Sequence, residues 1–168
     1  MYKRQFTSSQ AWDPKGLEKD VAKGQEAIDA LLESNPEMQR YFDAAAGYVV
    51  IPTVGKGGIG IGGARGKGLL YENGEPTAEV TMSQLTIGFQ WGGQAYSEFI
   101  FFEDTGALEH FKKGNYELGA QASAVAVTAG ASIDAGYESG VAIFTQVKGG
   151  LMYEASVGGQ KFKVKALK

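Results

Sequence analysis

The sequence has no cysteine and a single histidine, and these two shortages remove several kinds of chemistry. Without thiols the chain can form no disulfide, no thiolate metal site and no cysteine nucleophile, and its redox compartment stays open. A cluster of His and Cys metal ligands is excluded for the same reason. We therefore expect neither a metal nor another cofactor.

The chain also lacks long apolar runs and a strong excess of either charge. No segment approaches the roughly 18 to 20 apolar residues that a membrane-spanning helix needs. The formal net charge of −3 gives no overall electrostatic reason to expect nucleic acid or an anionic membrane as a partner, so local clusters of charge would have to provide one. Near the start, Lys3 and Arg4 have no apolar segment after them, so the sequence predicts no secretory signal. A trimmed envelope protein and a cytoplasmic protein remain alternatives.

Glycine is the residue in excess, with 25 of 168 residues, about 15% against a usual ~7%. Apolar residues make up 43% of the chain and include nine Phe, eight Tyr and two Trp, which is enough for a sizeable core. That composition argues against disorder and against a low-complexity linker. The length fits one domain.

The N-terminal third has the pattern of helices. Apolar residues from Pro14 to Glu33 recur with the period of one helix face, and Asp13 before Pro14 is a suitable N-cap. Asn35 and Pro36 predict the start of a second helix. After Gly47, short apolar or alternating runs between turn residues indicate antiparallel strands.

Two local signals interrupt the strands. The Asn73-Gly74 pair predicts a tight hairpin, because both residues readily adopt positive backbone angles. Residues 104–113 predict a short helix with a cap at Asp104 and a C-terminal signal at Gly114.

The predicted fold class is α+β. N-terminal helices pack on a Gly-rich antiparallel β-sheet that is barrel- or sandwich-like, with one short helix inserted near 104–113. We expect one domain over 1–168, in which 1–13 are flexible, 14–46 helical and 47–168 mainly β.

The glycine-rich stretch from Val54 to Gly68 could bind a phosphate, form a strand or act as a linker. Gly58, Gly60 and Gly63 formally match G-x-G-x-x-G. A dinucleotide site also needs a helix that starts at once and an acidic residue about 20 positions later, and neither is convincing. The spacing of a P-loop fails as well, so we reject the phosphate-loop interpretation.

The strand interpretation explains this stretch better. Gly58, Gly60 and Gly62 alternate with Ile59 and Ile61, so one face of the strand carries isoleucines and the other is bare backbone. A bare face lets a helix, another sheet or a ligand approach closely. We favour packing against the N-terminal helices or a tight barrel corner, with a ligand surface as the alternative.

Signals for catalysis are few, and we predict no enzyme. His110 lies in the predicted short helix, where a surface or partly packed position explains it best. On its predicted strand, Glu98 shares a face with Tyr96, Ile100 and Phe102 and should point inward. A buried carboxylate needs a partner such as an arginine, lysine or tyrosine, so we expect a structural salt bridge rather than a catalytic acid.

Positive charge is clustered although the total is acidic. Such clusters can bind anionic head groups, each cation near the surface contributing about 1 kcal/mol. Charged edge strands that discourage aggregation are an equally good explanation. The candidates are Lys56, Arg65 and Lys67 in the glycine-rich stretch and Lys161 and Lys163 in "KFKVK", where Lys165 shares their face.

Four segments taken together resemble the SYLF domain. They are "GYVVIP…GKGGIGIGGARGKGLLY", "LTIGFQWGGQAYSEFIFFED", "ALEHFKKGNYELGAQASAVAV" and "GGLMYEASVGGQKF". The resemblance runs from about Asp20 to Lys163, and the second half is closest to the bacterial envelope branch. Other members of the family include actin-associated endocytic proteins of eukaryotes.

The resemblance implies a non-enzymatic module that binds phosphoinositides or other anionic lipids at a membrane or cell-envelope surface. Eukaryotic members link an N-terminal amphipathic helix to membrane contact, and residues 14–33 would be that helix, which adds Lys15, Lys19 and Lys23 as head-group candidates. We do not expect actin as a partner in a bacterial context. The periplasm or envelope is the expected location if a signal peptide was removed, and the cytoplasm otherwise. The alternative is a structural or protein-interaction module that docks another envelope protein.

Overall fold

The computed structural model describes residues 14–56, 63–85, 95–119, 121–130, 133, 136–147 and 157–167. Several predictions fall outside these residues: the flexible segment 1–13, the strands "GGIGIG" and "GLMYEAS", most of "LTIGFQWG", and the bare face of Gly58, Gly60 and Gly62.

Helices form the N-terminal part, as predicted. Helix α1 spans Pro14–Ser34, a single 3-10 turn η2 spans Pro36–Met38, and α2 spans Gln39–Ala44. Asn35 occupies the N-cap position, but its side chain makes no cap hydrogen bond. The Asn35 amide instead donates to the carbonyl of Thr128 at 3.3 Å and ties the helical part to a distant segment. Among the described residues, no helix combines the length and apolar character needed to cross a bilayer.

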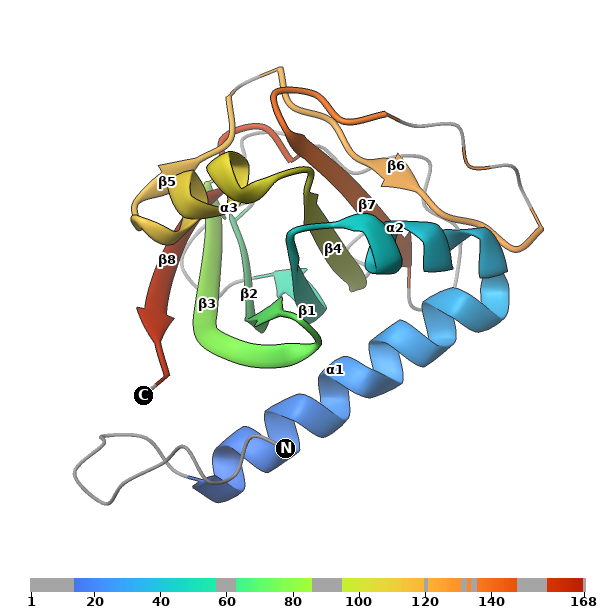
Figure 1. Cartoon of the computed structure of the whole chain (residues 1–168), viewed down its shortest axis with the longest axis horizontal. Coiled ribbons are helices and arrows are strands. Elements are labelled where there is room, and N and C mark those ends of the chain that lie inside the picture. Colours follow the sequence, from blue (N-terminus) through green and yellow to red (C-terminus); the bar gives the residue numbers. More distant parts are fainter. Residues whose placement is uncertain are drawn as a thin grey trace.

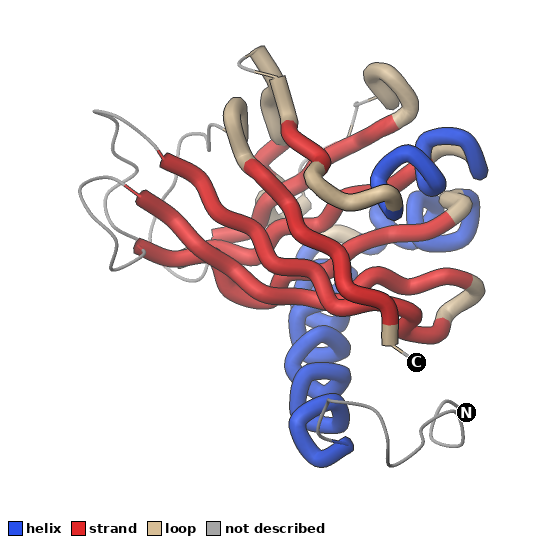
Figure 2. The backbone as a smooth tube through the Cα atoms, turned by 90° about the vertical axis from the view of Figure 1, so that its left-hand side faces the viewer, coloured by secondary structure: helices blue, strands red, loops and turns tan. Residues whose placement is uncertain are grey.

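The described strands form one curled, eight-stranded sheet in the order β5-β8-β3-β2-β1-β4-β7-β6. Figure 2 shows the strands bending round so that the sheet is partly rolled, which supports the barrel-like form of the prediction rather than the sandwich. The strands are β1 (Gly47–Lys56), β2 (Gly63–Glu72), β3 (Glu75–Leu85), β4 (Tyr96–Phe102), β5 (Tyr116–Glu117), β6 (Val125–Ala126), β7 (Val141–Val147) and β8 (Lys161–Ala166).

Neighbouring strands are antiparallel except for the β6–β7 pair, which is parallel. The hairpin between β2 and β3 turns at Asn73 and Gly74, whose φ angles are 56° and 79°. The predicted tight turn is thereby confirmed.

The segment from residue 116 to 130 differs from its prediction as strand. Only β5 and β6 are regular, and they lie at opposite edges of the sheet. The chain between them passes over the top of the molecule in Figure 1. Leu118 is buried there, and Ala122 and Ala124 pack against the core. The segment with alternating small residues is therefore a crossing connection that covers the hollow of the curl. Alternation alone could not distinguish such a connection from a strand.

Two apolar clusters lie on the two faces of the sheet. The inner cluster fills the hollow of the curl and includes Leu108 and Phe111 of helix α3 (Thr105–Lys112). The outer cluster includes residues of α1 and α2, which cover part of the outer face (Figure 1). Strand β4 is buried along its whole length because it contributes to both clusters.

The short helix confirms its predicted signals. The Asp104 carboxylate accepts a hydrogen bond from the backbone N–H of Ala107 at 2.9 Å. Gly114 follows the helix with a φ of 89°, as expected for a glycine that ends a helix.

Candidate functional site

Strand pairing brings four of the predicted cations onto one face of the sheet. Strands β2 and β8 are separated only by β3, and residues directly opposite each other point to the same side. The two resulting rows are Arg65–Ser83–Lys161 and Lys67–Thr81–Lys163. We call Arg65, Lys67, Lys161 and Lys163 the cationic array.

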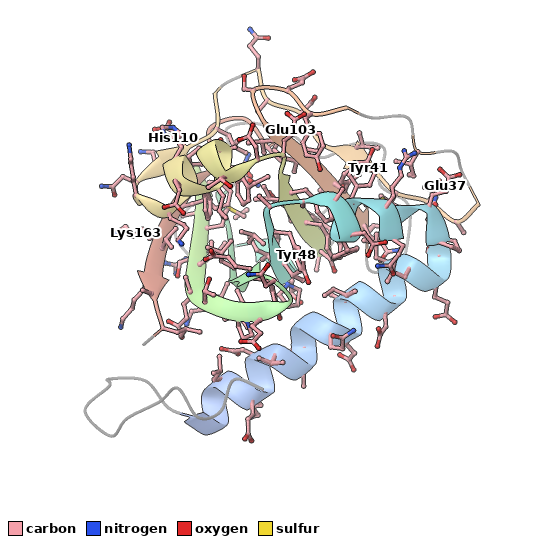
Figure 3. All side chains as sticks on the ribbon, in the orientation of Figure 1. Glu37, Tyr41, Tyr48, Glu103, His110 and Lys163 are labelled. Carbon is pink, nitrogen blue, oxygen red and sulfur yellow. The ribbon has the colours of Figure 1, made fainter. Side chains whose placement is uncertain are left out.

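The cationic array lies on the outer face of the sheet. The intervening residues of β3 and β8, Met82 and Phe162, point into the inner core. All four cations are exposed, and in the described part of the chain no ion pair engages any of them. Figure 3 shows Lys163 on β8, at the opposite side of the view from Glu37 and Tyr41.

The array has the dimensions of a small anionic surface patch. Strand spacing separates the β2 pair from the β8 pair by about 10 Å, and the two cations of one strand are about 7 Å apart. The hydroxyls of Thr81 and Ser83 lie between the charged columns. Like charges at these distances repel each other, so an anion that lies over them lowers the electrostatic free energy of the folded chain.

A groove adjoins the array where helix α1 lies against the sheet. Its volume is about 520 Å³, and Lys23 and Asp20 of α1 face Arg65 and Lys67 of β2 across it. A second groove of about 630 Å³ shares Lys23 with the first and continues toward β4 and β7. The open half of the outer face is therefore bordered by one flank of α1.

The glycines of β2 explain how this part of the sheet is shaped. A Cβ on Gly66 would lie 2.7 Å from the Cγ2 of Ile51, and one on Gly68 would collide with the carbonyl oxygen of Val50. Both glycines face β1 at the point where its pairing with β2 shifts by one residue between Val50 and Val54. At Gly66 and Gly68, protein therefore occupies the space that a side chain would take, whereas the predicted bare face of Gly58, Gly60 and Gly62 lies outside the described residues.

The other predicted cations are not all brought to the array. Lys23 lines both grooves. Lys19 is exposed on α1 and lines neither of them. The side chains of Lys15 and Lys56 lie outside the described part of the structure.

Sequence reasoning missed several members of this surface. Thr81 and Ser83 carry no motif, and only the pairing of β3 with both neighbours places them between the cations. Leu85, at the end of β3, is 78% exposed and opposite Gly63, so it lies on the same face. The alternation along β3 could have predicted that Leu85 is exposed. It could not have predicted which residues of other strands lie beside Leu85.

Glu98 is buried as predicted, but its partner is not a cation. It is fully buried beside the inner core, on the same side of β4 as Tyr96, Ile100 and Phe102. The Gln160 amide donates to its Oε1 at 3.0 Å, and in the described residues no salt bridge involves it. Among the described residues the partner of Glu98 is thus an amide and not the expected cation. Burial raises the pKa of Glu98 to about 7, against a smaller opposing effect of the Gln160 hydrogen bond.

His110 is the remaining residue that the sequence singled out. His110 is exposed on α3 and its ring contacts that of Tyr116 edge-on at 5.5 Å, in agreement with the predicted surface position (Figure 3). The described residues contain no group of three or more His, Asp or Glu side chains that could hold a metal ion.

Comparison with known proteins gives two findings. The family model described as "Ysc84: Las17-binding protein actin regulator" matches residues 83–166, which is half of the chain. The matched part includes Glu98 and the β8 half of the cationic array. Beta cell expansion factor A of Aeromonas veronii is 27% identical over 138 residues, which cover 81% of this chain and 52% of that protein. The chain thus spans about half the length of this curated relative.

Proposed function

The chain belongs to the Ysc84 family, whose domain is also called SYLF, and from that premise we propose that it binds anionic lipid surfaces through the cationic array. One observation carries the proposal. Two cation pairs that are 96 residues apart in the sequence are set side by side on an open face. Among the described residues no ion pair engages them, and Glu117 of β5 is the acidic residue directly opposite Lys161.

Electrostatics favour this ligand class. Each cation close to an anionic membrane contributes about 1 kcal/mol, so the four cations of the array together supply about 4 kcal/mol. That attraction is screened over about 10 Å at 0.1 M salt. Binding should therefore depend strongly on salt and on the charge of the lipid.

The groove beside α1 extends the proposed binding surface. Lys23 adds a fifth cation on the helix flank, and Thr53 of β1 adds a hydroxyl that can bond an anionic oxygen. Asp20 on the same flank opposes very highly charged ligands at that end. A head group of phosphoinositide type, the finer ligand class that the family resemblance implies, would have charged and hydroxyl partners on both walls.

The proposed role is binding without catalysis, at a membrane or cell-envelope surface. It is supported by an array that is exposed across three neighbouring strands, which suits a surface better than a reaction centre. Leu85 on the same face supplies an apolar contact beside the charges.

Charge-neutralising variants test the proposal. Arg65→Gln with Lys67→Gln, and separately Lys161→Gln with Lys163→Gln, should each weaken binding to phosphatidylserine-containing vesicles by about 30-fold, because each pair removes about 2 kcal/mol. Lys19→Gln with Lys113→Gln is the matched control, since it removes the same charge from exposed positions away from the array. Co-sedimentation with vesicles at low salt gives the affinities.

Equal losses in all three double variants would contradict the proposal, since net charge alone would then determine binding. If neutralised variants still captured a protein partner but no variant or wild type bound vesicles, the surface would belong to a protein-interaction module instead.

A further inference from the structure

A cluster of buried polar side chains from β4, β7 and the turn before β8 contains oxygen atoms without hydrogen-bond partners in the described part of the chain. Glu98, Gln160 and Thr145 are completely buried. Glu98 Oε1 accepts from the Gln160 amide, whereas Glu98 Oε2, Gln160 Oε1 and Thr145 Oγ1 have no hydrogen-bond partner in the described part of the chain. Unpaired buried polar atoms are costly, so two acceptor oxygens and one hydroxyl around a single carboxyl group need an explanation.

The described surroundings of Glu98 contain no cation that would balance a negative charge. In the sheet it lies opposite Ile51 of β1 and Thr145 of β7, and its contact with the turn before β8 is the neutral amide of Gln160. Among the described residues the titratable group that faces it is Tyr96. Burial and the nearby Glu98 raise the pKa of Tyr96, and a hydrogen bond with Gln160 opposes that rise. An ionised carboxylate here would be a buried charge without a counter-ion.

We propose that Glu98 is a neutral carboxylic acid in the folded protein and that its proton fastens Gln160 to β4. A proton on Oε2 converts the unpaired acceptor into a donor, and Gln160 Oε1 is an open acceptor on the residue already bound to Oε1. The two side chains then form an acid–amide pair with one hydrogen bond in each direction. We call this pair the Glu98–Gln160 clasp.

The clasp holds the turn that leads into β8. Two residues outside this turn also bind it. The Gln84 amide donates to the carbonyl of Gly158 at 3.2 Å, and the backbone N–H of Leu118 donates to the carbonyl of Gln160 at 2.9 Å. Lys161 follows Gln160 directly and belongs to the cationic array. The clasp thus fixes the first residues of the strand that carries half of the array, so its role in regulating binding rests on the proposed function.

The clasp makes this end of β8 sensitive to pH. The pKa of Glu98 is raised by burial from 4.5 to about 7, so between these values the folded chain keeps a proton that the unfolded chain has lost. The contribution of the Glu98 proton to folding stability is therefore complete below this window and is lost as the pH rises through it. An anionic membrane surface at about −30 mV lowers the local pH by roughly half a unit. A chain on that surface is therefore more fully protonated at Glu98, which favours the Glu98–Gln160 clasp.

The direct experiment is a titration of the Glu side-chain carboxyl carbons by ¹³C NMR of the full chain. Comparison with Glu98→Gln identifies the Glu98 signal. We expect a midpoint near pH 7, and a midpoint in the ordinary range of glutamate would overturn the proposal. This measurement does not depend on whether any lipid binds.

Two further readouts test what the clasp does. In wild type, hydrogen exchange at the backbone amides of 158–161, corrected for base catalysis, should accelerate above pH 7. Binding to phosphatidylserine vesicles should weaken in the same range by up to about 30-fold, because that is the contribution of Lys161 and Lys163. Glu98→Gln can pair with Gln160 as amide with amide at any pH, so both effects should disappear. Glu103→Gln, an exposed carboxyl, is the matched control and should behave as wild type.

The outcomes separate the two proposals. A Glu98 midpoint near 7 without vesicle binding at any pH would overturn the proposed lipid function and the regulation built on it. An ordinary midpoint with strong vesicle binding would overturn the clasp and leave the lipid function standing. Binding with the same pH dependence in wild type and Glu98→Gln would overturn the regulatory role of the clasp.

Discussion

Gly66 and Gly68 allow β2 to pass closely beside the irregular part of β1. Pro52 lies at that point of β1, where the lack of a backbone N–H suits a bulge rather than a regular strand. The hydroxyl of Ser97 on β4 donates to the Pro52 carbonyl at 2.8 Å and so holds the bulge from the other side. The bend that results positions Arg65 and Lys67, the residues on either side of Gly66.

Gly68→Ala should therefore be strongly destabilising. Its new Cβ would collide with the Val50 carbonyl oxygen and lie 2.9 Å from the Cα of Ile51, both backbone atoms that cannot move aside cheaply. We expect a loss of about 3 kcal/mol in the free energy of unfolding, measured by urea denaturation.

Gly55→Ala is the matched control for this substitution. Gly55 lies on β1, and a Cβ there would meet no atom within 4 Å. Its free energy of unfolding should stay within about 0.5 kcal/mol of wild type. Equal effects of the two substitutions would show that close approach is not the reason for glycine at position 68.

Residue-level prediction from the sequence succeeded where the backbone alone decides the outcome. The Asn73-Gly74 turn and the Asp104 cap depend on local geometry, and both are confirmed. The inward position of Glu98 followed from strand alternation and is also confirmed. The expected partner of Glu98 was a cation, whereas the described partner is Gln160, which reaches Glu98 from a turn 62 residues away. Strand alternation cannot reveal such a distant contact.

At the scale of single elements, β3 matters most for the proposed surface because it lies between the two cation-bearing strands. Its outer residues include Ser83 and Thr81 between the cations, Glu79 opposite Lys165, and the exposed Leu85 at its end. This strand thus places an apolar side chain beside four positive charges. The combination suits a surface with charged head groups above an apolar layer.

Leu85→Ser should weaken binding to anionic vesicles without weakening the fold. Inserting the side chain into the apolar layer is worth roughly 1.5 kcal/mol, so we expect about a tenfold loss of affinity by co-sedimentation. Because Leu85 is 78% exposed, its free energy of unfolding should change by less than about 0.5 kcal/mol.

Val125→Ser provides the comparison for this variant. Val125 is also exposed, at 36%, but it lies on β6 at the far edge of the sheet from β8. Its affinity for vesicles should remain that of wild type. A similar loss in both variants would mean that general surface hydrophobicity, and not the face of the array, contributes to binding.

Most elements could be predicted from the sequence, but their neighbours could not. Helical periodicity gave α1 almost to the residue, and the runs of apolar residues gave β1, β2, β3, β4, β7 and β8. The sheet order sets β8, the last strand in the described chain, beside β3. No local signal in "KFKVK" specifies that pairing, so the array could be seen only as separate clusters of charge.

In the molecule as a whole, the two faces of the sheet have different roles. The inner face is closed by α3 and by the crossing between β5 and β6, which leaves an apolar core there. Helices α1 and α2 cover only part of the outer face, and the cationic array lies beyond the flank of α1 (Figure 1). Thus the fold provides an open, charged area on a rigid sheet beside a fully packed core.

The central claim is that this open area binds anionic lipid, and the wild-type chain on vesicles of defined composition tests it most directly. Co-sedimentation should be measured with phosphatidylcholine vesicles, with and without phosphatidylserine, at low and at raised salt. The account predicts binding only to the vesicles with phosphatidylserine, and loss of that binding as salt screens the array. Absence of binding at low salt, or equal binding to both kinds of vesicle, would contradict it.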